Sequence, residues 1–183
     1  MNKIKFSKET LQIIFSGVGG QGLMLAGKLL GEAATGYEGK YAVMTSAYGV
    51  ETRGTFAKSD VIVSNSEINY PEVLKADLVI ALAPVAYKKY AESLDEKTIL
   101  LYDDTIVELP SKARQKKFPI TQIAKEANNP AGLNIVALGL LVKLTGIVSV
   151  ESIEKTIREE FSGKEKYADS NLKAFKAGFL AAE

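Results

Sequence analysis

Apolar residues along the chain alternate between short strand-like runs and longer stretches with helical spacing. The short runs are bounded by glycine, proline or polar residues, whereas the longer stretches repeat apolar residues every three or four positions. Strands are predicted over residues 11–16, 41–45, 56–64, 78–82 and 98–102. Residues 118–120 are predicted to form a further short edge strand, and residues 108–117 are predicted to be a polar surface excursion. Helices are predicted from about Gly20 to Gly36 and over 84–94, 120–127, 132–146, 150–161 and 167–182.

The alternation of strands and helices predicts one α/β domain over residues 1–183, without internal repeats or a linker. We expect a Rossmann-like, mostly parallel sheet with helices on both faces and the C-terminal helices packed on it. Ligands of such sheets bind at the carboxyl ends of the strands. The turn that follows the first strand lies at one such end.

This turn is rich in glycine, and it satisfies the pattern G-x-G-x-x-G between a predicted strand and a predicted helix. Its candidate ligand-binding residues are Gly17, Gly19, Gly20, Gln21 and Gly22. Glycines let the backbone approach a ligand closely, and the start of a helix favours negative charge. The turn therefore predicts an anion site. The alternative is that the glycines only allow the helix and the sheet to pack closely.

A dinucleotide site would also need an acidic residue at the end of the second strand, to bind the ribose hydroxyls. That strand ends in the residues Met44-Thr45-Ser46-Ala47, and Glu51 comes only later, in the following loop. The phosphate half of the dinucleotide pattern is thus present and the ribose half is missing. This argues against NAD and leaves other phosphate or carboxylate ligands open.

Composition narrows the chemistry that the chain can perform. It contains no cysteine and no histidine, which excludes thiolate-bound clusters, cysteine nucleophiles and imidazole bases. No metal site or catalytic residue is predicted. The formal net charge of +1 gives no broad basic field for nucleic acid or a membrane. With no signal peptide, and an apolar stretch over 132–148 that polar residues interrupt, a cytoplasmic location is expected.

The loop after the second strand, residues 45–55, gathers further polar groups at the same edge. Its candidate binding residues are Ser46, Tyr48, Glu51 and Arg53. The guanidinium of Arg53 can bind a phosphate or carboxylate with two hydrogen bonds, and Tyr48 can stack or hydrogen-bond. The alternative is a surface loop with a Glu51–Arg53 ion pair.

The two loops together resemble the gamma subunit of 2-oxoacid:ferredoxin (acceptor) oxidoreductases. The resemblance rests on Gly-Val-Gly-Gly-Gln-Gly after the first strand, on Tyr-Gly-x-Glu-x-Arg-Gly over 48–54, and on weaker matches at 77–82, 134–139 and 171–175. The loop departs from the family pattern at Ala47, where serine is usual, and at Thr55, where glycine is usual.

The resemblance implies an enzyme complex that oxidatively decarboxylates a 2-oxoacid onto coenzyme A and passes electrons to ferredoxin. Thiamine diphosphate and the iron–sulfur clusters belong to the alpha, beta and delta subunits. The gamma subunit packs against these partners and helps to bind coenzyme A. The isolated chain is expected to hold no cofactor, to be inactive, and to be able to self-associate. The 2-oxoacid stays open, although the loop residues favour 2-oxoglutarate or a branched-chain substrate.

The apolar stretch 132–146 predicts a helix that is buried all round or lies at an interface. Gly139 in its middle predicts close approach of another backbone, because glycine costs ~1 kcal/mol there relative to alanine. Asn134 at its start is a candidate binding residue that caps the helix or faces a partner subunit. Two other functions stay open: a stand-alone nucleotide-binding domain, and a scaffold whose loops make only protein contacts.

Overall fold

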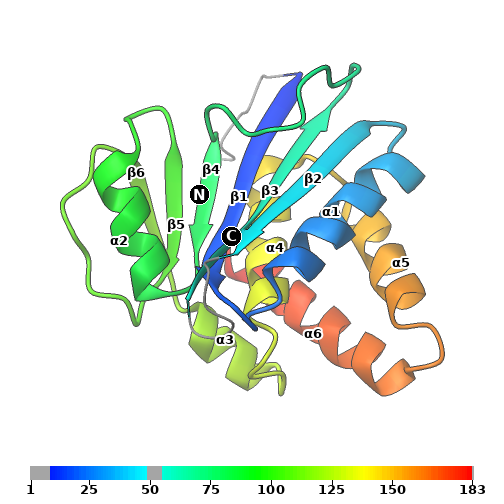
Figure 1. The fold of residues 1–183 in the computed structure, drawn as a ribbon. Coiled ribbons are helices and arrows are strands. Elements are labelled where there is room, and N and C mark those ends of the chain that lie inside the picture. The colour runs from blue at the N-terminus through cyan, green and yellow to red at the C-terminus, as the bar shows by residue number, and fades with distance from the viewer. Residues whose placement is uncertain (1–8, 49–54, 183) are drawn as a thin grey trace.

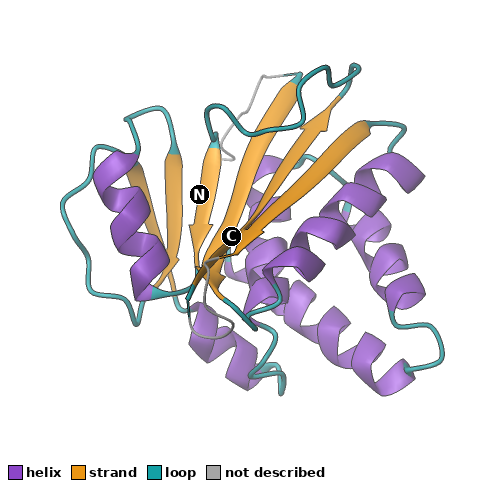
Figure 2. Ribbon diagram, viewed as in Figure 1, coloured by secondary structure: helices purple, strands orange, loops and turns teal. Residues whose placement is uncertain are grey.

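The computed structural model describes residues 9–48 and 55–182, which form a six-stranded mixed sheet with helices on both faces (Figures 1 and 2). The order across the sheet is β2-β3-β1-β4-β5-β6. The predicted α/β fold class is confirmed. The strands are β1 (Thr10–Val18), β2 (Tyr41–Tyr48), β3 (Phe56–Ser64), β4 (Leu78–Ala81), β5 (Ile99–Asp103) and β6 (Arg114–Phe118). The helices are α1 (Leu23–Tyr37), α2 (Pro84–Ser93), α3 (Ile120–Glu126), α4 (Leu133–Thr145), α5 (Val150–Glu160) and α6 (Glu165–Ala181).

Strand β3 runs against the direction of the other strands. It pairs antiparallel with both β1 and β2, whereas β1, β4, β5 and β6 pair in parallel. The segment between β2 and β3 is too short for a helical crossover, which needs a dozen or more residues, so β3 must return beside β2. This reversal brings the first residues of β3, rather than the last ones of β2, next to the carboxyl end of β1.

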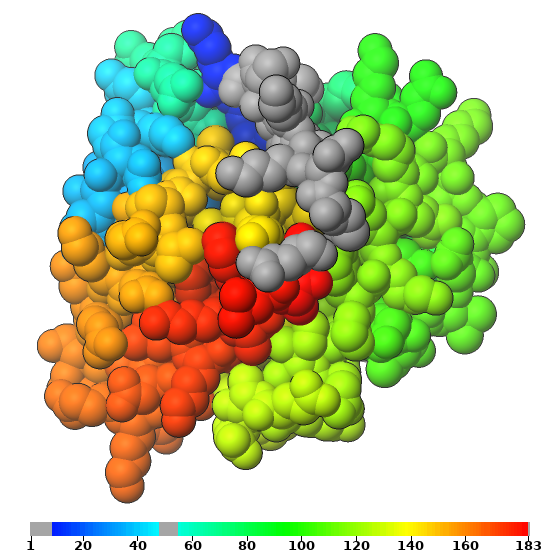
Figure 3. Space-filling model, turned by 180° about the vertical axis from the view of Figure 1, so that it is seen from behind, coloured from blue at the N-terminus to red at the C-terminus, as the bar shows by residue number. Residues whose placement is uncertain are grey.

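The two faces of the sheet carry unequal helical layers. Helices α1, α3, α4, α5 and α6 contribute to the larger core on one face, and α2 lies on the other (Figure 1). Strand β4 is buried on both faces, which explains why its sequence is wholly apolar. From behind, α6 (red) lies at the surface between α5 (orange) and the yellow-green segment around α3 (Figure 3). The C-terminal helices belong to the helical layer on this face of the sheet, where α6 packs on α3, α4 and α5, and α5 packs on α1.

Most boundaries differ from the sequence prediction by one or two residues, and three of the differences have a clear structural reason. Helix α1 begins at Leu23 instead of about Gly20, because Gly22 has the left-handed φ of 70° and ends the turn. Strand β2 continues to Tyr48, because the backbone of residues 45–48 pairs with β3. Strand β6 covers residues 114–118, most of which were predicted to be a surface excursion. The predicted edge strand 118–120 is wrong, because Phe118 ends β6 and Ile120 begins α3. The polar sequence of β6 suits an edge strand, whose side chains are largely in contact with solvent.

Helices α4 and α6 approach each other at glycines. A Cβ atom on Gly139 would overlap the carbonyl oxygen of Phe175, and one on Gly178 would overlap that of Val136. The backbones can approach this closely only because both positions lack a side chain. The predicted close approach at Gly139 is therefore confirmed, and its partner is α6 of the same chain. Helix α4 is buried almost all round, as its apolar sequence predicts.

Candidate functional site

The glycine turn lies between the carboxyl end of β1 and the start of α1. Gly20 and Gly22 have φ angles of 95° and 70°, which favour glycine. Within residues 9–48 and 55–182, no group accepts a hydrogen bond from the amide N–H of Gly20 or Gly22. Gly20 is exposed, and the helix dipole of α1 makes this end attractive to negative charge. The turn can therefore bind an anion through its backbone.

The side chain of Gln21 folds back inside the turn. Its Oε1 accepts a hydrogen bond from the backbone N–H of Val18 at 2.9 Å, and its Nε2 donates to the carbonyl of Leu82 at 3.0 Å. A Cβ atom on Gly17 would overlap Oε1 of Gln21, so Gln21 can take this position only beside a glycine. Gln21 thus joins the turn to the end of β4. In this arrangement both ends of its amide bind the protein itself.

Asn134 connects the turn to the buried helix α4. Its Nδ2 donates a hydrogen bond to the carbonyl of Gly22 at 2.9 Å, and only 3% of the residue is exposed. A Cβ atom on Gly22 would come within 2.5 Å of this nitrogen. The structure therefore brings Asn134, predicted from a distant part of the sequence, to the glycine turn. Its position there supports the backbone of the turn from behind.

The start of β3 and the residue before it also contact the turn. The N–H of Gly19 donates to the carbonyl of Thr55 at 3.1 Å. Ala57 pairs with Gly17 on β1 and with Tyr48 on β2, so these three residues form one row across the sheet. The backbone of Tyr48 is thereby placed one strand away from the first glycine. The predicted residues Glu51 and Arg53 lie outside the described residues.

Ser46 lies within strand β2 and not in a loop. It is exposed and pairs with Ser59 of β3. On the same face of β2, Met44 lies against Gly27 of α1 and Ala42 lies near Gly31. Ser46 is two residues further along, so it lies toward the first turn of α1. Strand β3 separates it from β1 and hence from the glycine turn.

A cavity of about 290 Å³ opens directly on the glycine turn. It is also lined by Lys58 at the start of β3, a residue that the sequence alone did not place here and whose ammonium group is bound to Asp60. The hydrophobic pattern identified residues 56–64 as a strand, but it could not place Lys58 at this edge, because that requires the reversed direction of β3. The cavity is lined by Val18, Gly19, Gly20, Gln21, Gly22, Leu23, Met24, Ala57 and Lys58.

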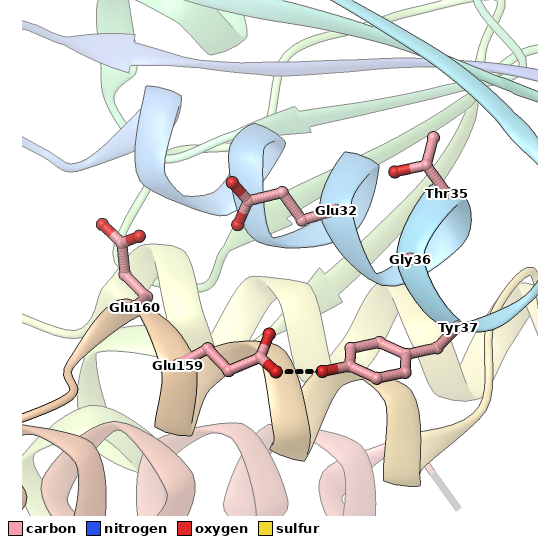
Figure 4. Close-up of a pocket in the computed structure, with 6 residues that line it drawn as sticks. All are labelled: Glu32, Thr35, Gly36, Tyr37, Glu159 and Glu160. Atoms are coloured by element: carbon pink, nitrogen blue, oxygen red, sulfur yellow. Dashed lines mark hydrogen bonds between the residues drawn. The ribbon is translucent and has the colours of Figure 1, made fainter.

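A second concavity, of about 450 Å³, lies between α1 and α5 and is lined by acidic side chains (Figure 4). It carries the carboxylates of Glu32, Glu159 and Glu160, and the hydroxyl of Tyr37 donates a hydrogen bond to Glu159. Like charges repel, so this concavity disfavours a phosphate or carboxylate ligand. The glycine turn is the better anion site of the two.

The described part of the chain contains neither a metal centre nor a membrane-spanning helix. No group of three or more acidic, histidine or cysteine side chains there could hold a metal ion. Across residues 9–48 and 55–182, no helix combines the length and the apolar character that crossing a membrane requires.

The fold and the turn define an α/β domain with a glycine-rich turn at the carboxyl edge of its sheet. The sequence profile of the family described as pyruvate ferredoxin/flavodoxin oxidoreductase matches residues 12–181. The chain therefore belongs to this family, and the family resemblance drawn from the two loops is confirmed.

Similar proteins occur both as separate subunits and as parts of longer chains. The 2-oxoglutarate synthase subunit KorC of Methanocaldococcus jannaschii is 42% identical, over 100% of this chain and 99% of the relative. The gamma subunit of the keto/oxoacid ferredoxin oxidoreductase from Geobacter sulfurreducens has a TM-score of 0.82 at 36% identity, covering 96% of this chain and 97% of that chain. The 2-oxoglutarate:ferredoxin oxidoreductase from Magnetococcus marinus, solved with 2-oxoglutarate, coenzyme A and succinyl-CoA bound, has a TM-score of 0.85 at 25% identity. The match covers 96% of this chain but 31% of that chain.

Proposed function

We propose that this chain is the gamma subunit of a 2-oxoacid:ferredoxin oxidoreductase, in which its glycine turn forms part of the coenzyme A site. The observation that carries the proposal is the cavity at the turn, where the N–H groups of Gly20 and Gly22 have no partner within the described residues. Coenzyme A carries phosphate groups, which such N–H groups and a helix N-terminus bind well. The family match and the coenzyme A in the Magnetococcus structure support the same ligand.

The thiamine diphosphate and the iron–sulfur clusters of the complex are assigned to the alpha, beta and possibly delta subunits. This chain has no cysteine or histidine to hold a cluster. Its part in the reaction is to bind and orient the acyl acceptor and to complete the assembly. Ferredoxin would receive electrons from the clusters of the partner subunits.

The substrate is proposed to be 2-oxoglutarate, because relatives named as 2-oxoglutarate synthase subunits are 35–42% identical to this chain. Ketoisovalerate oxidoreductase subunits are similar at 32–33% identity. Co-expression with alpha and beta chains of the same enzyme family from the same organism should give a complex that reduces ferredoxin only with coenzyme A and a 2-oxoacid. A higher kcat/KM for 3-methyl-2-oxobutanoate than for 2-oxoglutarate would overturn the choice of substrate.

A stand-alone dinucleotide-binding domain is the less suitable alternative. In a dinucleotide fold the strand beside β1 ends in the acidic residue that binds the ribose. Here the strand beside β1 is the reversed β3, which brings Lys58 to that edge instead. Titration of the isolated chain with NAD(H), NADP(H) or flavin should therefore show no saturable binding.

The coenzyme A site can be tested at Gly19, where the described residues leave open space for a side chain and φ is not positive. Gly19→Asp would place a carboxylate beside the bound phosphates, whereas Gly19→Asn has nearly the same size without the charge. In the assembled complex, Gly19→Asp should raise the KM for coenzyme A at least about tenfold above Gly19→Asn, since each tenfold corresponds to about 1.4 kcal/mol. Equal KM values for the two variants would refute a phosphate site at the turn.

A further inference from the structure

The two edge strands of the sheet differ in how they are protected from pairing with another strand (Figure 1). Strand β6, at one edge, carries three cationic side chains, Arg114, Lys116 and Lys117, among its five residues. Charged side chains, lysine above all, are a common device that keeps the edge of a sheet unpaired. Strand β2, at the other edge, has eight residues, and none of them is charged, proline or glycine. The edge of β2 thus lacks the protection that β6 has.

The pairing of β3 determines which backbone groups of β2 point outwards. At one end of the ladder between β1 and β3, the N–H of Gly19 donates to the carbonyl of Thr55. At the other end, the N–H of Asn65 donates to the carbonyl of Glu9. The odd-numbered residues of β3 therefore bond to β1, because successive residues of a strand bond to opposite neighbours. The even-numbered residues bond to β2, where they pair with odd-numbered residues.

Three residues of β2 consequently direct their backbone away from the sheet: Ala42, Met44 and Ser46. Each has an N–H and a C=O on the outer edge, and none of these groups has a partner within residues 9–48 and 55–182. Helix α1 leaves this edge open, because Met44 is 36% exposed although its side chain lies against Gly27. Such a row of unpaired backbone groups is a template for another strand.

The three outward-facing residues are symmetric about Met44, so β2 is complementary to a second copy of itself. If two copies pair antiparallel across a two-fold axis at Met44, Met44 faces its own copy and Ala42 faces Ser46 of the other copy. Each of these pairs then shares two hydrogen bonds. Every outward N–H and C=O of the three residues would be satisfied.

The side chains of β2 suit the same pairing. On the face opposite α1, Val43 would lie beside Thr45 of the second copy, and β-branched side chains pack well against each other across strands. No charged side chain of β2 would meet its like, since the strand has none. In β6, pairing with a second copy would bring cationic side chains together, which is unfavourable. Only one of the two edges is therefore suited to self-pairing.

We propose that the outer edge of β2 is an interface between two copies of this chain, which join their sheets into one across a two-fold axis at Met44. Two-fold contacts of this kind use the same surface on both copies. The inference goes beyond the proposed function and does not depend on it, because β3 separates the edge from the glycine turn. In the complex, the contact would join two gamma subunits.

The first test measures dimerisation of the full-length chain by sedimentation velocity over a range of concentrations. Ser46→Pro removes an outward N–H and leaves the bonds to β3 in place, because proline is tolerated where the N–H of an edge strand faces solvent. It should raise the dissociation constant of the dimer at least about tenfold, since two hydrogen bonds of the symmetric contact are lost. Ser46→Ala keeps the N–H and should change the constant less than about twofold. Lys117→Glu, at the other edge, should leave it unchanged.

Cysteine variants test the register, because the chain has no cysteine of its own. The Cα atoms of a hydrogen-bonded antiparallel pair lie about 5.5 Å apart, within reach of a disulfide. Under mild oxidation, Met44→Cys should therefore link to its own copy. Ser46→Cys alone should not, because its two copies would lie about 14 Å apart. A mixture of Ser46→Cys and Ala42→Cys should link, since these positions face each other.

The opposite results would overturn the inference. One is a wild-type chain that stays monomeric up to about 100 μM, which would leave the edge to a partner subunit. Another is a dimer that Ser46→Pro does not weaken, because the contact would then lie elsewhere. Linking of Ser46→Cys as fast as Met44→Cys would exclude the two-fold axis at Met44. If Ser46→Pro does not fold, as judged by circular dichroism, the cysteine variants decide.

Discussion

Replacing Gly17 with alanine should expel the Gln21 side chain from the glycine turn. The new Cβ would overlap Oε1 of Gln21, so the amide would have to leave its place. It would lose the hydrogen bond from Val18, at 2.9 Å, and the one to Leu82, at 3.0 Å. At about 0.5–1.5 kcal/mol for each, the free energy of unfolding should fall by ~1–3 kcal/mol.

The melting temperature should fall accordingly. A domain of 150–250 residues loses roughly 2–4 °C per kcal/mol, which gives a fall of roughly 2–12 °C for Gly17→Ala. Urea unfolding followed by circular dichroism measures the free energy directly. The matched control is Gly19→Ala, because its Cβ would meet no atom of residues 9–48 and 55–182 within 4 Å. Its free energy of unfolding should stay within about 0.5 kcal/mol of the wild type.

The pair of variants tests the role of Gln21 specifically. Gln21→Ala should cost as much as Gly17→Ala, and adding Gly17→Ala to Gln21→Ala should cost little more, because the hydrogen bonds are already lost. Full additivity of the two substitutions would refute the idea that Gly17 exists to accommodate Gln21. So would a Gly17→Ala protein as stable as Gly19→Ala.

Three further outcomes follow from the described residues. Gly139→Ala should lower the free energy of unfolding by ~1–3 kcal/mol in urea, because its Cβ would force α4 away from α6, whereas Gly31→Ala, whose Cβ meets only one atom at 3.8 Å, should stabilise α1. The pKa of Glu38 is lowered from 4.5 to about 2, chiefly by the hydrogen bond from Ser152. Its contribution to stability should be complete above pH 4.5 and lost as the pH falls towards 2, and Glu38→Gln should remove this dependence in acid unfolding curves. The pKa of Tyr90 is raised from 10.0 to about 12. Its contribution should be complete below pH 10 and lost as the pH rises through 12, and Tyr90→Phe should remove the corresponding step from an ultraviolet alkaline titration.

Much of the fold follows from local patterns that the sequence carries. The apolar run at 78–82 and the helical spacing of 150–161 identify β4 and α5, because burial on both faces or on one face sets the spacing of apolar residues. The glycine turn was also recognisable from a local pattern, because the positive φ angles at Gly20 and Gly22 require glycine. Gly139 likewise predicted a close backbone contact before its partner was known.

The direction of β3 was decided only by tertiary structure. The hydrophobic pattern of a strand is the same in both directions, so residues 56–64 could not reveal that β3 returns between β2 and β1. This single reversal moves the end of β2 away from the turn and brings Lys58 to it. The roles of Gln21 and Asn134 were hidden in the same way, because their partners, Leu82 and Gly22, are 61 and 112 residues away in sequence.

By itself, then, the sequence determined the α/β class, the glycine-rich turn and the family, because each depends on residues that are close together in the chain. The tertiary structure decided which side chains surround the turn. Gln21 and Asn134 support it through hydrogen bonds to the backbone, and Lys58 lines the cavity in front of it. These assignments depend on the order and direction of the strands. Long-range packing determines both, and a short sequence motif cannot predict them.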